Sequence, residues 1–493
     1  MNATTTAPPG LMNDLRWHGR IFTGEWSLPL GGAYDVREPA NGNSLGKVGH
    51  GNAQDIANAC KAASTAQRAW AKTGARERSA IFLKAAAVLE RSFEECAAIV
   101  ARETGGILPK GLHEVKETIA LLHGAAALAL GPRGEVLQSV SARLSYARRV
   151  PRGVVGVISP FNFPLILSMR AVAPALAVGN AVVLKPDRQT SLSGGFIIAR
   201  IFEEAGLPAG VLHVIPGAAE AGEALCLDPD VQMIQFTGST QVGRRVAELA
   251  GKTLKKVSLE LGGNNALIVL DDADIDAAVN NAAWGAWLHQ GQICMASSRI
   301  FVHESVLAEF TRKLAAKAAH LPVGDPKTQQ VALGPMMNER QLQRVQSIVA
   351  DTVQAGATIE AGGSSDKLFH QATVLSGVKP GMRAFHEETF GPVASIVSFR
   401  SDDEAVELAN LHDGALAAAV ISQSIGRAMA IADQLNAGMV HINDQTVNDD
   451  ANNPFGGPGV AGAGASVGGS ADLDEYTRWQ WMTIKDKPPA YPF

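Results

Sequence analysis

The chain has 493 residues, of which 46% are hydrophobic and 18% charged, with 50 glycines, 4 cysteines and a formal net charge of −5. This apolar content excludes disorder, and the length predicts roughly three domains. The slightly acidic balance argues against a nucleic-acid partner. Four cysteines without a Cys-x-x-Cys pair exclude a disulfide scaffold and argue against a zinc site, so no metal is expected.

No targeting or membrane segment is predicted. Residues 1–10 lack the charged start and apolar core of a secretory signal. The most apolar run, residues 119–130, falls short of the ~20 residues that a bilayer span needs. We therefore expect a cytoplasmic protein.

Helical spacing dominates the first hundred residues. Apolar side chains recur through 55–70 at helical intervals, and a second stripe runs from Phe82 to Val100, which predicts a second helix. Cys60 and Cys96 lie on these stripes, and Cys226 lies in an apolar stretch. All three are therefore predicted to be core thiols.

Strands and helices alternate from residue 153 onward. Strands are predicted at 153–158, 181–184, 211–215, 231–236 and 256–261, and helices at 165–178, 191–205, 220–227 and 241–250. This order predicts βαβ units and a parallel sheet with helices on both faces. Such sheets bind ligands beyond the carboxyl ends of their strands.

A second α/β block begins near residue 265. Strands are predicted at 266–270 and 299–302, with helices ending at 288 and covering 304–319. The acidic run 271–274 lacks the glycine and distal glutamate of a calcium loop, so it predicts a helix cap instead.

A strand–helix turn at Gly238-Ser239 could bind a phosphate. Glycine permits a tight turn, and a helix start offers free N–H groups and a positive dipole end. The spacing matches neither the dinucleotide fingerprint nor the P-loop, so a purely structural turn is the alternative.

Three residues are candidates for catalysis. Cys294 lies in a polar loop, which suits a nucleophilic thiol. Glu260 ends an apolar strand before two glycines, where burial would raise its pKa toward that of a general base. Asn162 follows a strand between two prolines, where its amide could stabilise an oxyanion. Taken singly, each has an ordinary alternative: an incidental loop thiol, a turn cap and a turn asparagine.

Seven motifs in consistent order, from about residue 20 to the C-terminus, resemble the aldehyde dehydrogenase superfamily. They are Phe161-Asn-Phe-Pro164, Lys185-Pro186, Phe236-Thr-Gly-Ser239, Leu259-Glu-Leu-Gly-Gly263, Gly291-Gln-Ile-Cys294, Glu388-Thr-Phe-Gly-Pro392 and Pro454-Phe-Gly-Gly457. Five further stretches are similar to the bacterial benzaldehyde dehydrogenases: 194–195, 283–285, 288–292, 438–444 and 489–493.

The resemblance implies a covalent mechanism. Cys294 would attack the aldehyde to form a thiohemiacetal, whose oxyanion the Asn162 amide and the Cys294 backbone N–H would hold. Hydride transfer to the nicotinamide would leave a thioester. Glu260 would then activate the water that releases the acid.

The resemblance also implies a bound NAD. The positions carried over are Ser159, Phe161, Lys185, Arg188, Gly238, Ser239, Leu261, Glu388 and Phe390. Lys185 would bond the adenosine ribose, Ser239 the pyrophosphate and Glu388 the nicotinamide ribose. Arg188 stands where many NAD-preferring relatives have an acidic residue. It cannot accept a bond from the ribose 2′-hydroxyl but could tolerate a 2′-phosphate, so we expect NAD with some use of NADP.

Apolar side chains near the nucleophile suit a flat aromatic aldehyde. The expected pocket comprises Phe163, Leu167, Arg170, Leu288, Ile293, Met295 and the loop 447–454. Arg170 replaces a bulky aromatic of many relatives. It could widen the pocket, meet a polar ring substituent, or form an ion pair away from the substrate.

Other enzymes of the superfamily remain alternatives: a semialdehyde or aliphatic aldehyde dehydrogenase, or a coenzyme A-acylating enzyme. Glu260 argues against the last, which needs no water-activating carboxylate. A catalytically dead relative would be expected to lack Cys294, Glu260 or Asn162.

The family fold implies an α/β protein with three parts. A Rossmann-like cofactor domain would comprise 1–130 and 152–262, a catalytic α/β domain 263–460, and a small β segment 131–151 with 461–493. The basic, alternating stretch 139–150 predicts an exposed strand in this segment. The segment would join subunits in a homodimer or homotetramer.

Overall fold

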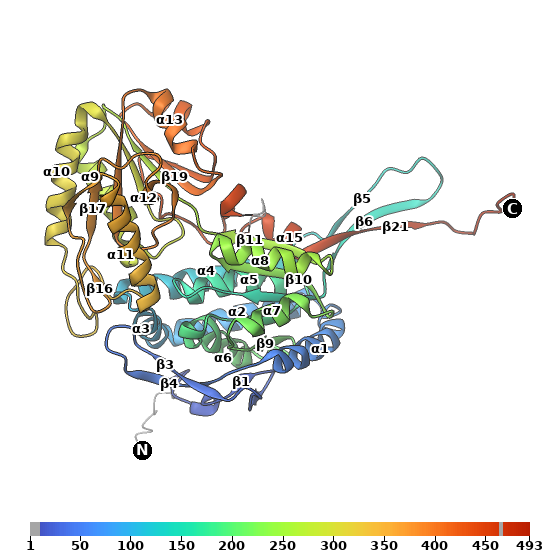
Figure 1. Ribbon diagram of the computed structural model, residues 1–493. Coiled ribbons are helices and arrows are strands. Elements are labelled where there is room, and N and C mark those ends of the chain that lie inside the picture. The colour runs from blue at the N-terminus through green and yellow to red at the C-terminus, as the bar shows by residue number, and fades with distance from the viewer. Residues whose placement is uncertain (1–9, 463–466) are drawn as a thin grey trace, which may run out of the picture.

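The computed structural model describes residues 10–462 and 467–493. Two seven-stranded sheets form two bodies, and a three-stranded arm projects from them with the C-terminus near its tip (Figure 1). Most strands of both sheets are parallel, so the predicted α/β fold class is confirmed by the strand pairing.

Short strands and four long helices precede the first sheet. The early elements are η1 (Leu15–Trp17), β1 (Ile21–Phe22), β2 (Trp26–Ser27), β3 (Ala33–Arg37), β4 (Ser44–Gly49), α1 (Ala53–Trp70), α2 (Ala75–Arg91), α3 (Phe93–Thr104) and α4 (Leu108–Leu130). The predicted helix at 55–70 is confirmed as α1. The second predicted helix is wrong as a single element, because Ser92 leaves helical geometry and separates α2 from α3.

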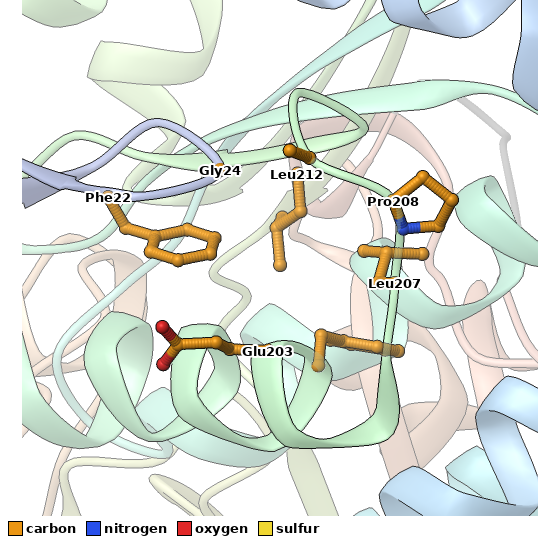
Figure 2. A pocket seen from close by; sticks show the side chains of 8 residues that line it. Phe22, Gly24, Glu203, Leu207, Pro208 and Leu212 are labelled. Atoms are coloured by element: carbon orange, nitrogen blue, oxygen red, sulfur yellow. The ribbon is translucent and has the colours of Figure 1, made fainter.

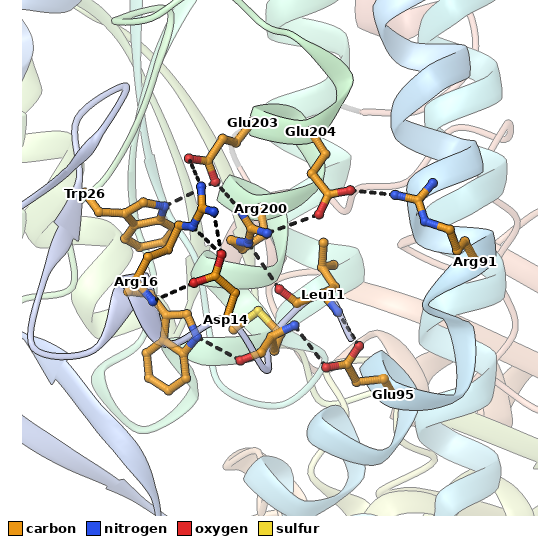
Figure 3. A network of polar contacts seen from close by, with 11 residues as sticks. Leu11, Asp14, Arg16, Trp26, Arg91, Glu95, Arg200, Glu203 and Glu204 are labelled. Atoms are coloured by element: carbon orange, nitrogen blue, oxygen red, sulfur yellow. Dashed lines mark hydrogen bonds and ion pairs between the residues drawn. The ribbon is translucent and has the colours of Figure 1, made fainter. Parts of the chain in front are cut away.

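Polar contacts fasten the start of the described chain to helices α3 and α6 (Ile197–Ala205) (Figure 3). Glu95 accepts hydrogen bonds from the backbone N–H groups of Leu11 (2.6 Å) and Met12 (2.9 Å). Arg200 donates to the Leu11 carbonyl (3.1 Å) and to Glu204 (3.1 Å). Buried backbone groups of this segment thereby find partners without belonging to a sheet.

The first sheet has the strand order β11-β10-β7-β8-β9-β1-β2. Its elements are β7 (Val154–Ile158), α5 (Pro164–Ala177), β8 (Ala181–Lys185), η2 (Arg188–Thr190), α6 (Ile197–Ala205), β9 (Leu212–Val214), α7 (Ala219–Leu227), β10 (Val231–Gly238), α8 (Thr240–Gly251) and β11 (Lys256–Leu261). The predicted helix 191–205 begins instead as a π-helical turn, η3 (Leu192–Phe196). A Cβ on Gly195 would lie 2.8 Å from Val214, so glycine permits close packing there.

The second sheet has the order β14-β17-β18-β13-β12-β19-β20. Its strands are β12 (Ala266–Val269), β13 (Arg299–His303), β14 (Thr358–Ala361), β17 (Thr373–Ser376), β18 (Val393–Phe399), β19 (Ala415–Ile421) and β20 (Ala437–Ile442). Its helices are α9 (Ile275–Trp287), α10 (Glu304–His320), α11 (Glu339–Gln354), α12 (Arg383–His386), α13 (Asp402–Asn410) and α14 (Ile425–Ala432), and a hairpin pairs β15 (Ser365–Asp366) with β16 (Phe369–His370). The predicted acidic cap is confirmed, because Asp274 accepts from the Ala277 N–H (2.9 Å).

The arm consists of β5 (Gly134–Val136), β6 (Leu144–Pro151) and β21 (Thr477–Ile484). Two short helices, η5 (Gly459–Ala461) and α15 (Ala471–Tyr476), precede β21 in the chain. The predicted strand 139–150 therefore begins later, at Leu144. Trp479 and Trp481 of β21 are 48% and 62% exposed. The three-part division at the stated residue boundaries stays a prediction.

Within the described ranges, none of the helices is long and apolar enough to cross a membrane. Those same ranges contain no cluster of three or more His, Cys, Asp or Glu side chains arranged to hold a metal ion.

Candidate active site

The loop that carries Cys294 is shaped by left-handed backbone. His289, Gln290 and Gly291 of η4 (Leu288–Gly291) have φ angles of 49°, 56° and 64°. A Cβ on Gly291 would lie 2.1 Å from the Gly391 carbonyl oxygen, so this position requires glycine. The turn redirects the chain between α9 and β13 and brings Cys294 to the amino-terminal edge of the second sheet.

Asn265 anchors this loop to the second sheet. Its Nδ2 donates to the carbonyls of Cys294 (2.7 Å) and Ala296 (3.0 Å). Its Oδ1 accepts from the Ala417 N–H of β19 (2.9 Å). A single buried amide thus holds the backbone of the Cys294 loop. The sequence pattern gave no sign of this role beyond the position of Asn265 directly after Gly262-Gly-Asn264.

The thiol of Cys294 differs from the other three. Cys60, Cys96 and Cys226 are buried, as predicted for core thiols, whereas Cys294 keeps part of its surface exposed. Enclosure by the surrounding protein raises the pKa of the Cys294 thiol, and Glu388 adds to this rise while Arg170 opposes it. A raised pKa favours the protonated thiol, whose proton must leave when the sulfur attacks a carbonyl.

Glu260 is a buried carboxylate without a hydrogen-bond partner. It lies in β11 beside Thr237 of β10, at the carboxyl edge of the first sheet, and is 3% exposed. Neither carboxyl oxygen has a partner among the described residues. Burial raises the pKa of Glu260 well above its usual range, with Arg170 opposing and Glu475 adding to the rise. A carboxylate with a raised pKa is a stronger base than one exposed to water.

A small cavity adjoins Glu260. Its lining residues are Leu167, Arg170, Ala171, Gln235, Thr237, Glu260, Phe455 and Val467. The volume of about 10 Å³ is room for one water molecule at most. Gln235, another lining residue, has a buried side-chain carbonyl oxygen with no partner among the described residues, so the lining offers polar groups to a water.

Asn162 follows β7 at the same carboxyl edge and is 3% exposed. It precedes α5 by one residue, Phe163. The Phe163 ring meets the His289 imidazole edge-on at 5.3 Å between centroids. This contact joins the Asn162 loop to the Cys294 loop.

The expected cofactor residues line the same edge. Lys185 ends β8, with a buried ammonium whose hydrogen bond is to the Pro186 carbonyl (3.4 Å). Ser239 caps the start of α8 and remains exposed. Glu388 lies against Gly262, where a Cβ would be 2.1 Å from its Oε2, and its Oε1 is buried without a partner in the described part of the chain. Burial raises the pKa of Glu388 to about 8.

The six remaining expected cofactor positions surround this edge. The Phe161 and Phe390 rings meet edge-on at 5.8 Å. Ser159 accepts a hydrogen bond from Ser168 (2.7 Å), and Leu261 lies under Gly243, where a Cβ would be 2.4 Å from Leu261. Arg188 lies with its guanidinium carbon 4.4 Å above the Tyr34 ring. A Cβ on Gly238 would be 2.6 Å from the Phe236 ring, so this turn requires glycine.

Most of the expected pocket residues lie in one apolar cluster with Cys294. Ile293 and Met295 belong to one apolar cluster, against which Phe163, Leu288, Cys294 and Val447 pack. Leu167 instead lines the cavity beside Glu260. Arg170 forms an ion pair with Asp449 and lies 4.5 Å from the Phe455 ring. An ion pair is therefore observed, but its place differs from the expected alternative of a pair away from the substrate, because Arg170 also lines the cavity beside Glu260.

A second cavity of similar size carries no such chemistry (Figure 2). It is bounded by apolar groups such as Phe22, Leu207 and Leu212, and its one charged residue is Glu203. Trp26 and Arg200 already engage the Glu203 carboxylate.

The partly exposed thiol of Cys294 and the buried carboxylate of Glu260, which has no hydrogen-bond partner among the described residues, are the two potentially reactive groups of this region. The aldehyde dehydrogenase family model matches residues 26–482, and the chain belongs to this family. The resemblance stated from the motifs is thereby confirmed.

Similar proteins match over almost their whole length. The chain is 49% identical to a vanillin dehydrogenase of Amycolatopsis sp., covering 98% of this chain and 99% of that protein. It is also 49% identical to a benzaldehyde dehydrogenase [NAD(+)] of Pseudomonas putida, covering 97% and 98%. The betaine aldehyde dehydrogenase of Staphylococcus aureus, solved in complex with NAD+, superposes with a TM-score of 0.94 at 30% identity, covering 97% of each chain.

Proposed function

We propose that this protein oxidises an aromatic aldehyde to the carboxylic acid with NAD. The observation that carries the proposal is the partly exposed Cys294, which packs against an apolar cluster, together with the buried Glu260, which has no hydrogen-bond partner among the described residues and helps to raise the pKa of the Cys294 thiol. The names of the two relatives at 49% identity, vanillin dehydrogenase and benzaldehyde dehydrogenase, support an aromatic substrate.

Cys294 supplies the nucleophile. Its sulfur bonds to the aldehyde carbon, the carbon–oxygen π electrons move onto oxygen to form an oxyanion, and the thiol proton passes to a water molecule at the exposed part of Cys294. The Asn162 amide and the Cys294 backbone N–H donate to that oxyanion, in a site from which water is largely excluded, where such bonds are strongest. The apolar cluster of Ile293 and Met295 holds the flat ring beside the sulfur.

Glu260 acts in the second half of the cycle. The carboxylate takes a proton from a water, whose oxygen then bonds to the thioester carbon while the carbon–sulfur bond breaks. The acid leaves and the thiolate is regenerated. The small cavity beside Glu260 provides a place for such a water, or for a water that later accepts the proton from Glu260.

The residues at the carboxyl edge of the first sheet fit a dinucleotide. The buried ammonium of Lys185, the exposed helix start at Ser239 and the unpartnered oxygen of Glu388 are polar groups suited to ribose and phosphate. A bound nicotinamide would supply the hydride acceptor. Phe390 and Phe161 form an aromatic wall beside it.

A coenzyme A-acylating reaction is the competing proposal. It would require coenzyme A, instead of water, to take the acyl group from Cys294. The buried Glu260 favours hydrolysis, because a thiol acceptor needs no carboxylate to activate water. Omitting coenzyme A from an assay with NAD and benzaldehyde separates the two reactions.

The first prediction concerns the substrate. With NAD, benzaldehyde is expected to give a higher kcat/KM than acetaldehyde or succinic semialdehyde, because the apolar cluster rewards ring burial at roughly 25 cal/mol per Å². Initial rates of NADH formation over the three aldehydes provide the measurement. An advantage above tenfold for either non-aromatic aldehyde would contradict the aromatic assignment.

The second prediction concerns the cofactor. NADP is expected to be used less efficiently than NAD but measurably, because Arg188 is exposed and held over Tyr34 with N–H groups free for a 2′-phosphate. Arg188→Glu should lower kcat/KM for NADP by at least about tenfold and spare NAD, since a charge-assisted bond becomes a repulsion.

The matched control is Arg76→Glu, the same charge change at an exposed position of α2. It should leave kcat/KM unchanged for both NAD and NADP. Absence of any NADP turnover by the unsubstituted enzyme would contradict the role given to Arg188.

We also propose that the arm joins subunits of a homodimer or homotetramer. Its strands β5 and β21 lie at the edges of the three-stranded sheet, and an exposed edge with large apolar side chains such as Trp481 invites pairing. Sedimentation equilibrium of the purified chain tests this assembly.

A further inference from the structure

A buried ion pair lies behind the Asn162 loop and takes no part in the mechanism above. Lys110 and Glu114 stand one turn apart on α4, with side chains 2% and 0% exposed, and form a salt bridge. Burying two charges is costly unless each is paired and hydrogen-bonded. The hydrogen-bond partners of Lys110 and Glu114 therefore show which segments the ion pair stabilises.

Glu114 closes the start of helix α5. Its Oε2 accepts hydrogen bonds from the backbone N–H groups of Leu165 (3.0 Å) and Ile166 (3.2 Å). The first N–H groups of a helix have no partner within it, and Phe163, the capping residue, supplies no side-chain bond. The carboxylate also suits the positive end of the helix dipole. Glu114 thus fixes the backbone three residues after Asn162.

Lys110 extends the contact to the other side of the loop. Its ammonium lies 4.5 Å from the centre of the Phe163 ring and donates to Thr104 (3.3 Å). Phe163 in turn packs edge-on against His289 at 5.3 Å. Burial lowers the pKa of His289, and Lys110 lowers it further, so the imidazole packs as a neutral ring.

These contacts form one continuous connection from α4 to both halves of the oxyanion site. Glu114 holds the helix that follows Asn162, and the rings of Phe163 and His289 link that loop to the one bearing Cys294. We propose that Lys110 and Glu114 are positioning residues that keep the Asn162 amide in register with Cys294. The inference rests on the proposed function, because it needs Cys294 as nucleophile and Asn162 as oxyanion donor.

The test uses a reaction that needs no cofactor. With p-nitrophenyl acetate and the full-length protein, the Cys294 sulfur bonds to the acetyl carbon through an oxyanion, and p-nitrophenolate leaves with the electron pair. The rate constant of the first turnover then reports attack at the oxyanion site, and its amplitude counts the competent sites.

Glu114→Ala is expected to lower that rate constant by about 100-fold, since displacement of a catalytic group by about 1 Å has an effect of this size. Its amplitude should stay near that of the unsubstituted protein. Glu114→Gln keeps a carbonyl oxygen for the two N–H groups. Its first-turnover rate constant should therefore stay within about tenfold of that of the unsubstituted protein. Lys110→Met should give an intermediate loss and provides the test if Glu114→Ala does not fold.

The matched control is Arg102→Met on neighbouring α3. It removes one of the two cations that pair with another buried carboxylate, Glu38, which is 2% exposed and keeps Lys327 at 3.6 Å. Its first-turnover rate constant should be unchanged, whatever stability it loses.

Unchanged rate constants in both Glu114→Ala and Lys110→Met would overturn the inference. So would a loss of amplitude at constant rate, which indicates fewer folded molecules instead of a displaced amide. A protein that cleaves the ester through Cys294 but oxidises no aldehyde would contradict the proposed function alone. The comparison of the variants would still decide the positioning role.

Discussion

Replacement of Cys294 by serine is expected to lower kcat/KM for aldehyde oxidation by at least about 10,000-fold. A serine hydroxyl is far less acidic than a thiol, and nothing in this apolar cluster would ionise it. The expected cofactor residues belong to the first sheet and to the Glu388 loop, so the affinity for NAD should be preserved. Steady-state rates with benzaldehyde and titration calorimetry with NAD measure the two effects.

The control for this substitution is Cys226→Ser, the same atom change at a buried position of α7. It should reduce stability, because a hydroxyl enters an apolar environment, and leave turnover intact. Aldehyde oxidation by the Cys294→Ser protein at the rate of the unsubstituted protein would overturn the mechanism as a whole.

The second large effect is expected from Glu260→Gln. The amide cannot accept a proton from water, so the thioester should accumulate and steady-state turnover should fall by about 100- to 10,000-fold. Attack by Cys294 does not require this base, so the first turnover of NADH should persist as a burst. Stopped-flow absorbance followed by steady-state assay resolves the two phases.

The same residue predicts a pH dependence. Burial raises the pKa of Glu260, and the ionised form is the one that accepts a proton. When thioester hydrolysis limits turnover, the rate should therefore rise as the pH rises through this elevated pKa. It should be low at pH values below that pKa. The rise should be absent in Glu260→Gln. Glu38→Gln, which neutralises a buried carboxylate away from the site, should retain it.

An equal loss of burst and steady-state rate in Glu260→Gln would place the carboxylate in the first step instead. It would then serve as the base that removes the proton of Cys294, whose pKa is also raised by its surroundings. The two readouts thus distinguish the roles that one buried carboxylate can have.

Local sequence patterns predicted most of the elements around the site. Helical periodicity marked α1, and apolar runs followed by glycine or proline marked β7 and β11, whose ends carry Asn162 and Glu260. The split between α2 and α3 was missed because one residue, Ser92, interrupts helical geometry without breaking the apolar stripe. Periodicity records which residues face the core, and both helices present the same stripe.

The left-handed turn before Cys294 had no local signal. His289 and Gln290 are residues that rarely adopt positive φ, and glycine alone at 291 gives no reason to expect it of its neighbours. Contacts made by distant segments hold the turn, such as the bonds from Gln290 to the carbonyls of Gly105 and Pro335. The energy that stabilises the strained backbone therefore comes from tertiary packing.

The sequence by itself determined the family, the fold class and the residue types available for the chemistry. The tertiary structure alone decided how those residues affect one another. It paired Arg170 with Asp449, 279 residues away, beside Glu260, and placed the ion pair of Lys110 and Glu114 behind the Asn162 loop. Proton affinity and hydrogen bonding depend on burial and on neighbours within a few ångströms. Those neighbours come from segments far apart in the chain, so they are set only when the chain folds.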